Sequence, residues 1–341
     1  MRFGAVPLAE AVGHVLAHNV VDGGGRRVLR KGRELSADDV ETLRRLGRDE
    51  VTVARLEPGD VGEDEAADRI TRHVAAGSVR RAGPSTGRVN LHAIELGVLR
   101  IDPRRLLELN SCPGVTLATL RDWTVVRPDR MVGTTKILPY ALEAEVLEQA
   151  LAVPAPILEV EPLPRRRAHL VVTAGAGSRE KTLAGFEKAL RQRLEALGSS
   201  LVASCTVSSD VGGEEELASA LAAAKQAGAE LVVVAGETAI QDRHDTAPRA
   251  LERAGGEVTC YGAPVDPGNL LLLGALGEVP VLGAPGCARS PKRNIVDLLL
   301  PRLLLGHPVS RLEVLELGHG GLLEDVPERP LPRREIERED R

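Results

Sequence analysis

Three loop-forming stretches between residues 231 and 308 carry the side chains best suited to chemistry. They read AGETAIQDRHDTAP over 235–248, DPGN over 266–269 and GAPGCARSP over 283–291. The first and the third each follow an apolar run and precede a segment with a helical pattern. Glycine-rich turns that leave buried strands and enter helices are where open α/β sheets bind anionic ligands. The loops therefore predict an anion-binding site.

The first loop is dense in charged side chains, with Asp242, Arg243 and Asp245 following closely on Thr238. A carboxylate at a phosphate site usually acts through a divalent cation such as Mg²⁺, and an arginine offers charge opposite to an anionic substrate. Asp245 also suits the N-cap of the next helix, although two aspartates cannot both cap one helix. We therefore predict catalytic roles for Asp245 and Asp242, with Asp245 as a magnesium ligand.

The other two loops supply backbone donors and cations. The stretch 283–293 joins glycines and prolines to Arg289, Lys292 and Arg293, which would suit a phosphorylated ligand. The alternative is that these cations are simply solvated. Cys287 lies inside this loop, where a nucleophilic role competes with that of an ordinary buried thiol.

A further loop at 173–182 contains two glycines and a serine. It resembles an anion-binding turn, but it matches neither GxGxxG nor GxxxxGK[ST], and a flexible strand-to-helix turn is the alternative. The predicted ligand-binding residues are Thr173, Gly175, Gly177, Ser178, Gly236, Glu237, Thr238, Arg243, Pro267, Gly268, Asn269, Gly283, Pro285, Gly286 and Cys287.

Alternating strand and helix patterns position these loops. Strands are predicted at 169–173, 201–207, 231–235, 258–261, 270–275 and 279–282, and helices at 183–197, 214–227, 247–254 and 294–305. Such alternation predicts a three-layer α/β/α domain with a mainly parallel sheet over 168–310. Right-handed crossovers would place the strand-end loops along one edge.

The rest of the chain predicts an α+β accessory region, a linker and a tail. Within residues 1–152 we expect helices at 8–16, 37–46, 64–74, 102–110 and 141–151, and strands at 50–54, 116–120, 124–126 and 131–137. The segment 153–167, with four prolines and three consecutive arginines, is the expected linker. A strand is expected at 311–317, and disorder in the charged tail that ends at residue 341.

Composition limits the function classes. The 341 residues are 43% hydrophobic and 27% charged, which is typical of a globular protein. Aromatic residues make up 1% and the net charge is −5, so neither base-stacking platforms nor a basic field favours nucleic acid. No apolar run reaches the ~20 residues that span a bilayer. The four cysteines form no CxxC pair, so we expect reduced thiols in a cytoplasmic protein.

The order of the loops resembles the molybdopterin-binding fold family, which includes molybdopterin adenylyltransferase, the molybdotransferase that inserts molybdate, and the N-terminal domain of CinA proteins. The resemblance covers about 167–309 and rests on VVVAGETAIQDRHDTAP, DPGNLLLLG and VLGAPGCARSP. PLAEAVGHVLAHNV and VLRKGRELSADDVETLRRLGRDEVTV are more weakly similar to accessory parts of molybdotransferases. Asp245 matches the family's aspartate in the second loop.

Several positions depart from the family pattern. Glu237 stands where a phosphate-facing glycine is usual, Asn269 replaces a lysine, and Cys287 replaces an asparagine. Only Asp210 remains of an aspartate pair that follows the second strand. The resemblance with these departures implies a scaffold that binds molybdopterin or molybdenum cofactor, as carrier or chaperone.

Two enzymatic alternatives remain open. The first is an active adenylyltransferase or molybdotransferase that uses Mg²⁺ and ATP with Asp245, Asp210 and Asp242, and the second is pyrophosphate hydrolysis of the CinA type. The resemblance also implies a homo-oligomer whose partners are a pterin-phosphate small molecule and other molybdenum-cofactor biosynthesis proteins or molybdoenzymes.

Overall fold

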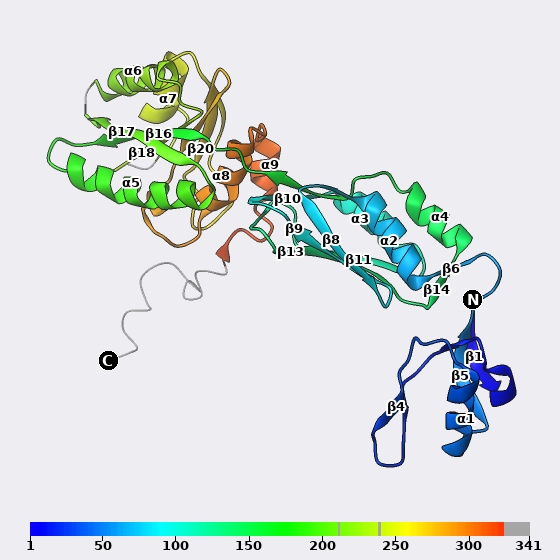
Figure 1. Cartoon of the computed structure of the whole chain (residues 1–341). Helices are drawn as coiled ribbons and strands as arrows, with labels where there is room; N and C mark the ends of the chain where they lie inside the picture. Colours follow the sequence, from blue (N-terminus) through cyan, green and yellow to red (C-terminus); the bar gives the residue numbers. More distant parts are fainter. Residues whose placement is uncertain (211, 238–239, 324–341) are drawn as a thin grey trace. The chain divides into compact units, whose positions relative to one another are not determined.

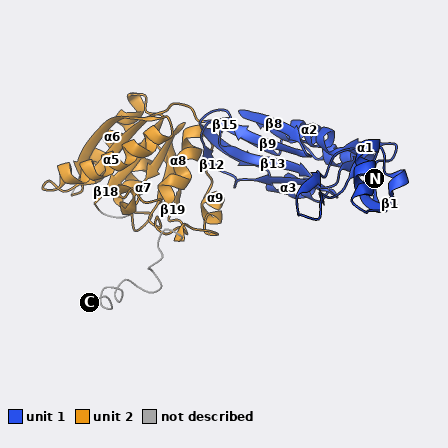
Figure 2. Ribbon diagram, turned by 60° about the horizontal axis from the view of Figure 1, so that its bottom comes forward, with its two compact units in different colours: residues 1–162 blue, residues 163–341 orange. Residues whose placement is uncertain are grey.

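The computed structural model describes residues 1–210, 212–237 and 240–323. The chain folds as two compact units, residues 1–162 and 163–341, which Figure 2 colours separately. Within the described residues, no helix combines the length and the apolar character that a membrane crossing requires.

The first unit begins with a small antiparallel sheet in the order β1-β5-β2. Its elements are β1 (Arg2–Pro7), β2 (Val15–Leu16), β5 (Glu50–Arg55), the hairpin β3 (Val20–Val21) and β4 (Arg27–Leu29), and helix α1 (Ala37–Arg45). Ser36 caps α1 in a capping box with Asp39, which confirms the predicted helix start. The helix predicted at 8–16 is wrong: a 3-10 turn, Leu8–Glu10, is followed by Gly13 at φ +82° and by β2.

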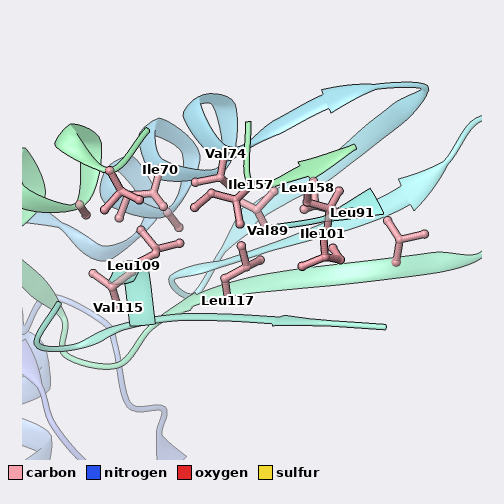
Figure 3. Packing of buried hydrophobic residues seen from close by; sticks show 14 of the residues in the cluster. Ile70, Val74, Val89, Leu91, Ile101, Leu109, Val115, Leu117, Ile157 and Leu158 are labelled. Carbon is pink, nitrogen blue, oxygen red and sulfur yellow. The ribbon is translucent and has the colours of Figure 1, made fainter. Parts of the chain in front are cut away.

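The remainder of this unit packs helices against two four-stranded sheets and one two-stranded sheet. Its strands are β6 (Asp60–Gly62), β7 (Ala75–Gly77), β8 (Val79–Ser85), β9 (Arg88–Ala93), β10 (Gly97–Ile101), β11 (Val115–Thr119), β12 (Thr124–Val126), β13 (Met131–Ile137), β14 (Ala141–Glu143) and β15 (Leu158–Pro162). Its helices are α2 (Glu63–Val74), α3 (Pro103–Asn110) and α4 (Ala144–Ala152). Ile70, Leu91 and Leu158 lie in its buried apolar core, shown in Figure 3.

Two segments depart from expectation. The predicted linker contains strand β15, in which Leu158 and Val160 are fully buried and which pairs with β10 and β7. Residues 311–317, predicted as a strand, instead form helix α9 (Arg311–Glu316), because Ser310 and Glu313 make a capping box. The predicted disordered tail lies outside the described residues from position 324 onward.

The second unit is built on a six-stranded sheet in the order β17-β16-β18-β21-β20-β19. The strands are β16 (Arg167–Ala174), β17 (Ser200–Ser208), β18 (Leu231–Gly236), β19 (Glu257–Tyr261), β20 (Leu272–Leu276) and β21 (Val279–Gly283). The pairings β16–β17, β16–β18 and β18–β21 are parallel, whereas β20 runs antiparallel to both its neighbours. The mainly parallel sheet is therefore confirmed.

Helices cover both faces of this sheet. Figure 1 shows α6 (Gly213–Gln226) and α7 (Thr246–Arg253) on one side, and α5 (Arg179–Ala196) and α8 (Ile295–Leu305) on the other. The central strand β18 is apolar and buried over Leu231–Ala235 because alternate side chains face the two helical layers. Val232 belongs to the core under α6 and α7, whereas Val233 lines a small gap that Phe186 of α5 and Val296 of α8 also line. The three-layer α/β/α prediction is confirmed.

Candidate functional site

The topology brings all the predicted loops to one edge of the sheet. Parallel strands β16, β18 and β21 end there, so the loops that follow Ala174, Gly236 and Gly283 share this edge. Strand β20 is reversed and therefore starts at the same edge, which adds the DPGN loop before Leu272. A cavity of about 30 Å³ at the end of β18 is lined by Thr173, Val234, Ala235, Gly236, Ile240, Asp245, Thr246, Ala247, Ala284 and Pro285.

Gly236 fixes the relation between the first two loops. It pairs in register with Thr173, and the Glu237 N–H donates to the Thr173 carbonyl at 3.2 Å. A Cβ at Gly236 would lie 2.0 Å from the Thr173 hydroxyl oxygen. A larger residue here would therefore displace the Thr173 hydroxyl, and the Glu237 N–H bond holds the two loops together.

The Glu237 carboxylate is bound by the loop at the start of α5. Its Oε2 accepts from the Gly175 N–H at 3.1 Å, and its Oε1 accepts from the Thr182 hydroxyl at 2.8 Å. The Ser178 hydroxyl, the Gly175 N–H and the Thr182 hydroxyl hold the pKa of Glu237 below its ordinary value. Gly177, in contrast, faces open space. Glu237 is thus ionised at neutral pH and bound where an anionic ligand was expected.

The aspartates of the second loop are engaged by backbone donors. Asp245 is the N-cap of α7, and its two carboxylate oxygens accept from the N–H groups of Thr246 at 2.7 Å and Gln241 at 3.0 Å. Asp242 Oδ1 accepts from the His244 N–H at 2.8 Å in an Asx turn. Backbone N–H groups therefore hold both carboxylates in place. A catalytic role for either aspartate stays a prediction.

Two other predicted residues, Arg243 and Asp210, lie outside the Asp245 cap of α7 in the described structure. Arg243 is exposed and pairs with Glu252 of α7 at 2.6 Å. Asp210 is an exposed residue after β17, and strand β16 separates it from the end of β18 by about 10 Å of sheet. Thr238 lies outside the described residues.

The DPGN loop is anchored on the start of α8. The Pro267 carbonyl accepts from the Ile295 N–H at 3.2 Å. Gly268 has φ +142°, and a Cβ there would lie 2.5 Å from Ile295 Cβ, so the loop tolerates only glycine at this close approach. Asn269 is exposed at the edge.

Arg193 holds the third loop from behind. Its guanidinium, in a side chain only 9% exposed, binds Asp297 of α8 at 2.9 Å. It also donates to the carbonyl oxygens of Ala288 at 3.0 Å, Ser290 at 2.8 Å and Lys292 at 3.2 Å. One cation therefore binds three backbone carbonyls of this loop.

The same loop has a second anchor in the buried Asn294, which caps α8. Its side chain accepts from the Val296 N–H and donates to the carbonyl oxygens of Cys287 and Lys292. Burial raises the pKa of the Cys287 thiol, which disfavours the thiolate that a nucleophile needs.

The cations of this loop differ in their surroundings. Arg289 stacks over Phe186 of α5 with its guanidinium carbon 5.1 Å from the ring centre. Lys292 and Arg293 are exposed. Gly283 and Pro285 are buried and Gly286 is exposed, so the loop rises from the sheet to the surface within four residues.

Four residues of the site were missed by the sequence analysis: Thr182, Phe186, Arg193 and Asn294. The signal lay in the helix periodicity, because Arg193 falls on the apolar stripe of α5 with Phe186 and Leu190. A charge on a buried stripe needs a buried partner, which only the structure identifies. Among the described residues, His, Cys, Asp and Glu side chains form no group of three that could hold a metal ion.

Comparison with known proteins gives few matches in sequence and several in structure. A family model described as a domain of unknown function, DUF8806, matches residues 5–55. A search of the curated proteins found no match.

Solved structures similar to this chain include three from molybdenum-cofactor pathways. The molybdenum cofactor biosynthesis protein of Pyrococcus furiosus is 14% identical, with a TM-score of 0.25, and the match covers 92% of this chain but 65% of that protein. The molybdopterin biosynthesis MoeA protein of Pyrococcus horikosii is 14% identical, with a TM-score of 0.33, over 89% of this chain and 75% of that one.

The molybdopterin biosynthesis Mog protein of Mycobacterium ulcerans is 16% identical, with a TM-score of 0.27, over 40% of this chain and 94% of that one. At these identities and scores the matches concern the fold and assign no activity to this chain. The matched structures named here are molybdopterin and molybdenum cofactor biosynthesis proteins.

Proposed function

We propose that this chain binds molybdopterin or molybdenum cofactor, as a carrier or chaperone in cofactor maturation. The observation that carries the proposal is the convergence of the four loops at one sheet edge in the family's order. One of these loops, 283–293, is held in place by the buried Arg193 and Asn294, so this part of the edge is preorganised. Cations at 289, 292 and 293 offer charge opposite to a pterin phosphate.

The ligand would lie across the loops. A cavity of about 30 Å³ at the end of β18 holds about one water, whereas small-molecule sites enclose roughly 300 Å³ or more. Binding along an open edge exposes one face of the ligand, which suits a protein that passes its cargo to a partner. We therefore place the pterin over 283–293 and 266–269.

Carriage is tested by purifying the full chain and analysing bound pterin by mass spectrometry and by fluorescence of its oxidised products. The expected result is a pterin in near-stoichiometric amount after growth with molybdate. A preparation that contains no pterin, and that binds none when molybdopterin is added, would overturn the proposal.

An adenylyltransferase or molybdotransferase is the second candidate, because Asp245 lines the cavity. In that case a carboxylate would hold Mg²⁺ against the phosphates of ATP. Release of pyrophosphate from ATP, Mg²⁺ and molybdopterin is the measurement, and no release excludes adenylyl transfer.

The variant Asp245→Asn separates the cap from the charge. Asparagine caps helices about as well as aspartate does, so this variant keeps the bond from the Thr246 N–H while removing the negative charge and the acceptor for the Gln241 N–H. Catalysis through Asp245 predicts loss of turnover in a variant that stays folded, whereas carriage predicts unchanged pterin binding. Asp102→Asn at the cap of α3, where Asp102 accepts from the N–H groups of Arg104 and Arg105, is the matched control.

A further inference from the structure

The Glu237 carboxylate is bound by two donors at the start of α5. Its two oxygens take the Gly175 N–H and the Thr182 hydroxyl, from the loop and the first turn of α5. A backbone N–H together with a hydroxyl at a helix N-terminus is the donor arrangement that binds phosphate. In this chain a carboxylate from the neighbouring strand end fills it.

This placement is fixed by the sheet. Gly236 lies in register with Thr173 and has no room for a Cβ, and the Glu237 N–H donates to the Thr173 carbonyl at 3.2 Å. The backbone therefore directs the Glu237 side chain toward Gly175, whose N–H donates to the carboxylate at 3.1 Å. Arg289 of the third loop favours the ionised carboxylate through its charge.

We infer that Glu237 is a built-in anion that excludes a phosphoryl group from the loop at the start of α5 and so determines which ligands the edge accepts. A phosphate entering here would meet a like charge and would find both donors taken. We then expect anionic groups to bind near the exposed cations Lys292 and Arg293. The inference rests on the proposed function in taking this edge as the ligand site.

Titration with inorganic phosphate tests the inference without any pterin. Isothermal titration of the full chain at pH 7.5 should show binding at least about tenfold tighter in Glu237→Ala than in the parent, because both donors become available. The isosteric variant Glu237→Gln should give an intermediate gain, since its amide keeps one acceptor but no charge. It also serves if the alanine variant folds poorly.

Two controls make the result specific. Adding Thr182→Val to Glu237→Ala removes a donor and should abolish the gain. Glu278→Ala makes the same charge change in the exposed turn between β20 and β21, at the opposite edge, and should give no gain. Equal affinity of parent and Glu237→Ala, or an equal gain in Glu278→Ala, would overturn the inference.

The two proposals fail separately. Tighter phosphate binding by Glu237→Ala, together with no pterin in the purified chain, would support the inference and contradict the proposed pterin binding. Pterin in the purified parent, together with unchanged phosphate affinity in Glu237→Ala, would support pterin binding and contradict the inference about Glu237.

Discussion

Replacing Arg193 by methionine should loosen the third loop and destabilise the second unit. Methionine replaces the apolar stem of the side chain but removes the donors to Asp297 and to the carbonyls of Ala288, Ser290 and Lys292. Removing one member of a buried, hydrogen-bonded ion pair costs about 3–5 kcal/mol. Because Asp297 remains 27% exposed, we expect a loss of about 3 kcal/mol.

The matched control lies two residues earlier on the same helix. Arg191 is 43% exposed and pairs with Glu187 at i,i+4, so Arg191→Met should cost less than about 1 kcal/mol. Urea unfolding followed by circular dichroism gives the free energies, and hydrogen exchange of peptide 285–297 locates the change. Equal losses in the two variants, or unchanged exchange in Arg193→Met, would refute the assignment of Arg193 as the anchor of the loop.

Three further predictions concern the same unit. Gly236→Ala should destabilise the unit by more than about 2 kcal/mol in urea unfolding, because its Cβ meets the Thr173 hydroxyl, and adding Thr173→Ala should recover part of the loss. Gly268→Ala should cost a similar amount and also slow pterin binding, as measured by stopped-flow fluorescence, because φ is +142°. The hydrogen bond from Arg166 lowers the pKa of Glu230 from its ordinary 4.5, so its stabilisation is complete above pH 4.5 and is lost as pH falls through the folded-state pKa. Glu230→Gln should remove that pH dependence, at most about 1 kcal/mol because both side chains are about one third exposed, and unchanged urea midpoints across pH 3–7 in the parent would contradict it.

The strand and helix order of the second unit could be predicted from sequence because its apolar runs are unbroken. Leu231–Gly236 is buried on both faces, and such a run between turns has one good solution in an α/β sheet. The reversal of β20 could not be predicted, since its direction depends on pairing with β21 and not on its own residues.

The elements of the first unit were harder to predict because the local sequence patterns there are ambiguous. The apolar spacing of 8–16 suits a helix, yet Gly13 turns the chain and Leu16 pairs with Val53. Prolines near β15 suggested a linker, although Pro162 ends the strand and the alternation of Leu158 and Val160 already carried the strand signal.

The sequence predicted the location of the candidate site but not the side-chain contacts within it. The glycines and the cap at Asp245 follow from turn and helix chemistry. The contact of Glu237 with Thr182 joins residues from two crossovers, so no local pattern reports it. Arg193 was missed for the same reason.

The reversed strand β20 has a consequence for how the edge assembles. Strands β19, β20 and β21 form a meander in which Leu276 pairs with Val279 across a tight turn, whereas β16 and β18 pair only after a long crossover. Loop-closure entropy is small for the meander and larger for the crossover. We expect the strands beside the DPGN loop to fold first. Strands β16 and β18 and the Glu237 loop would then pack against them.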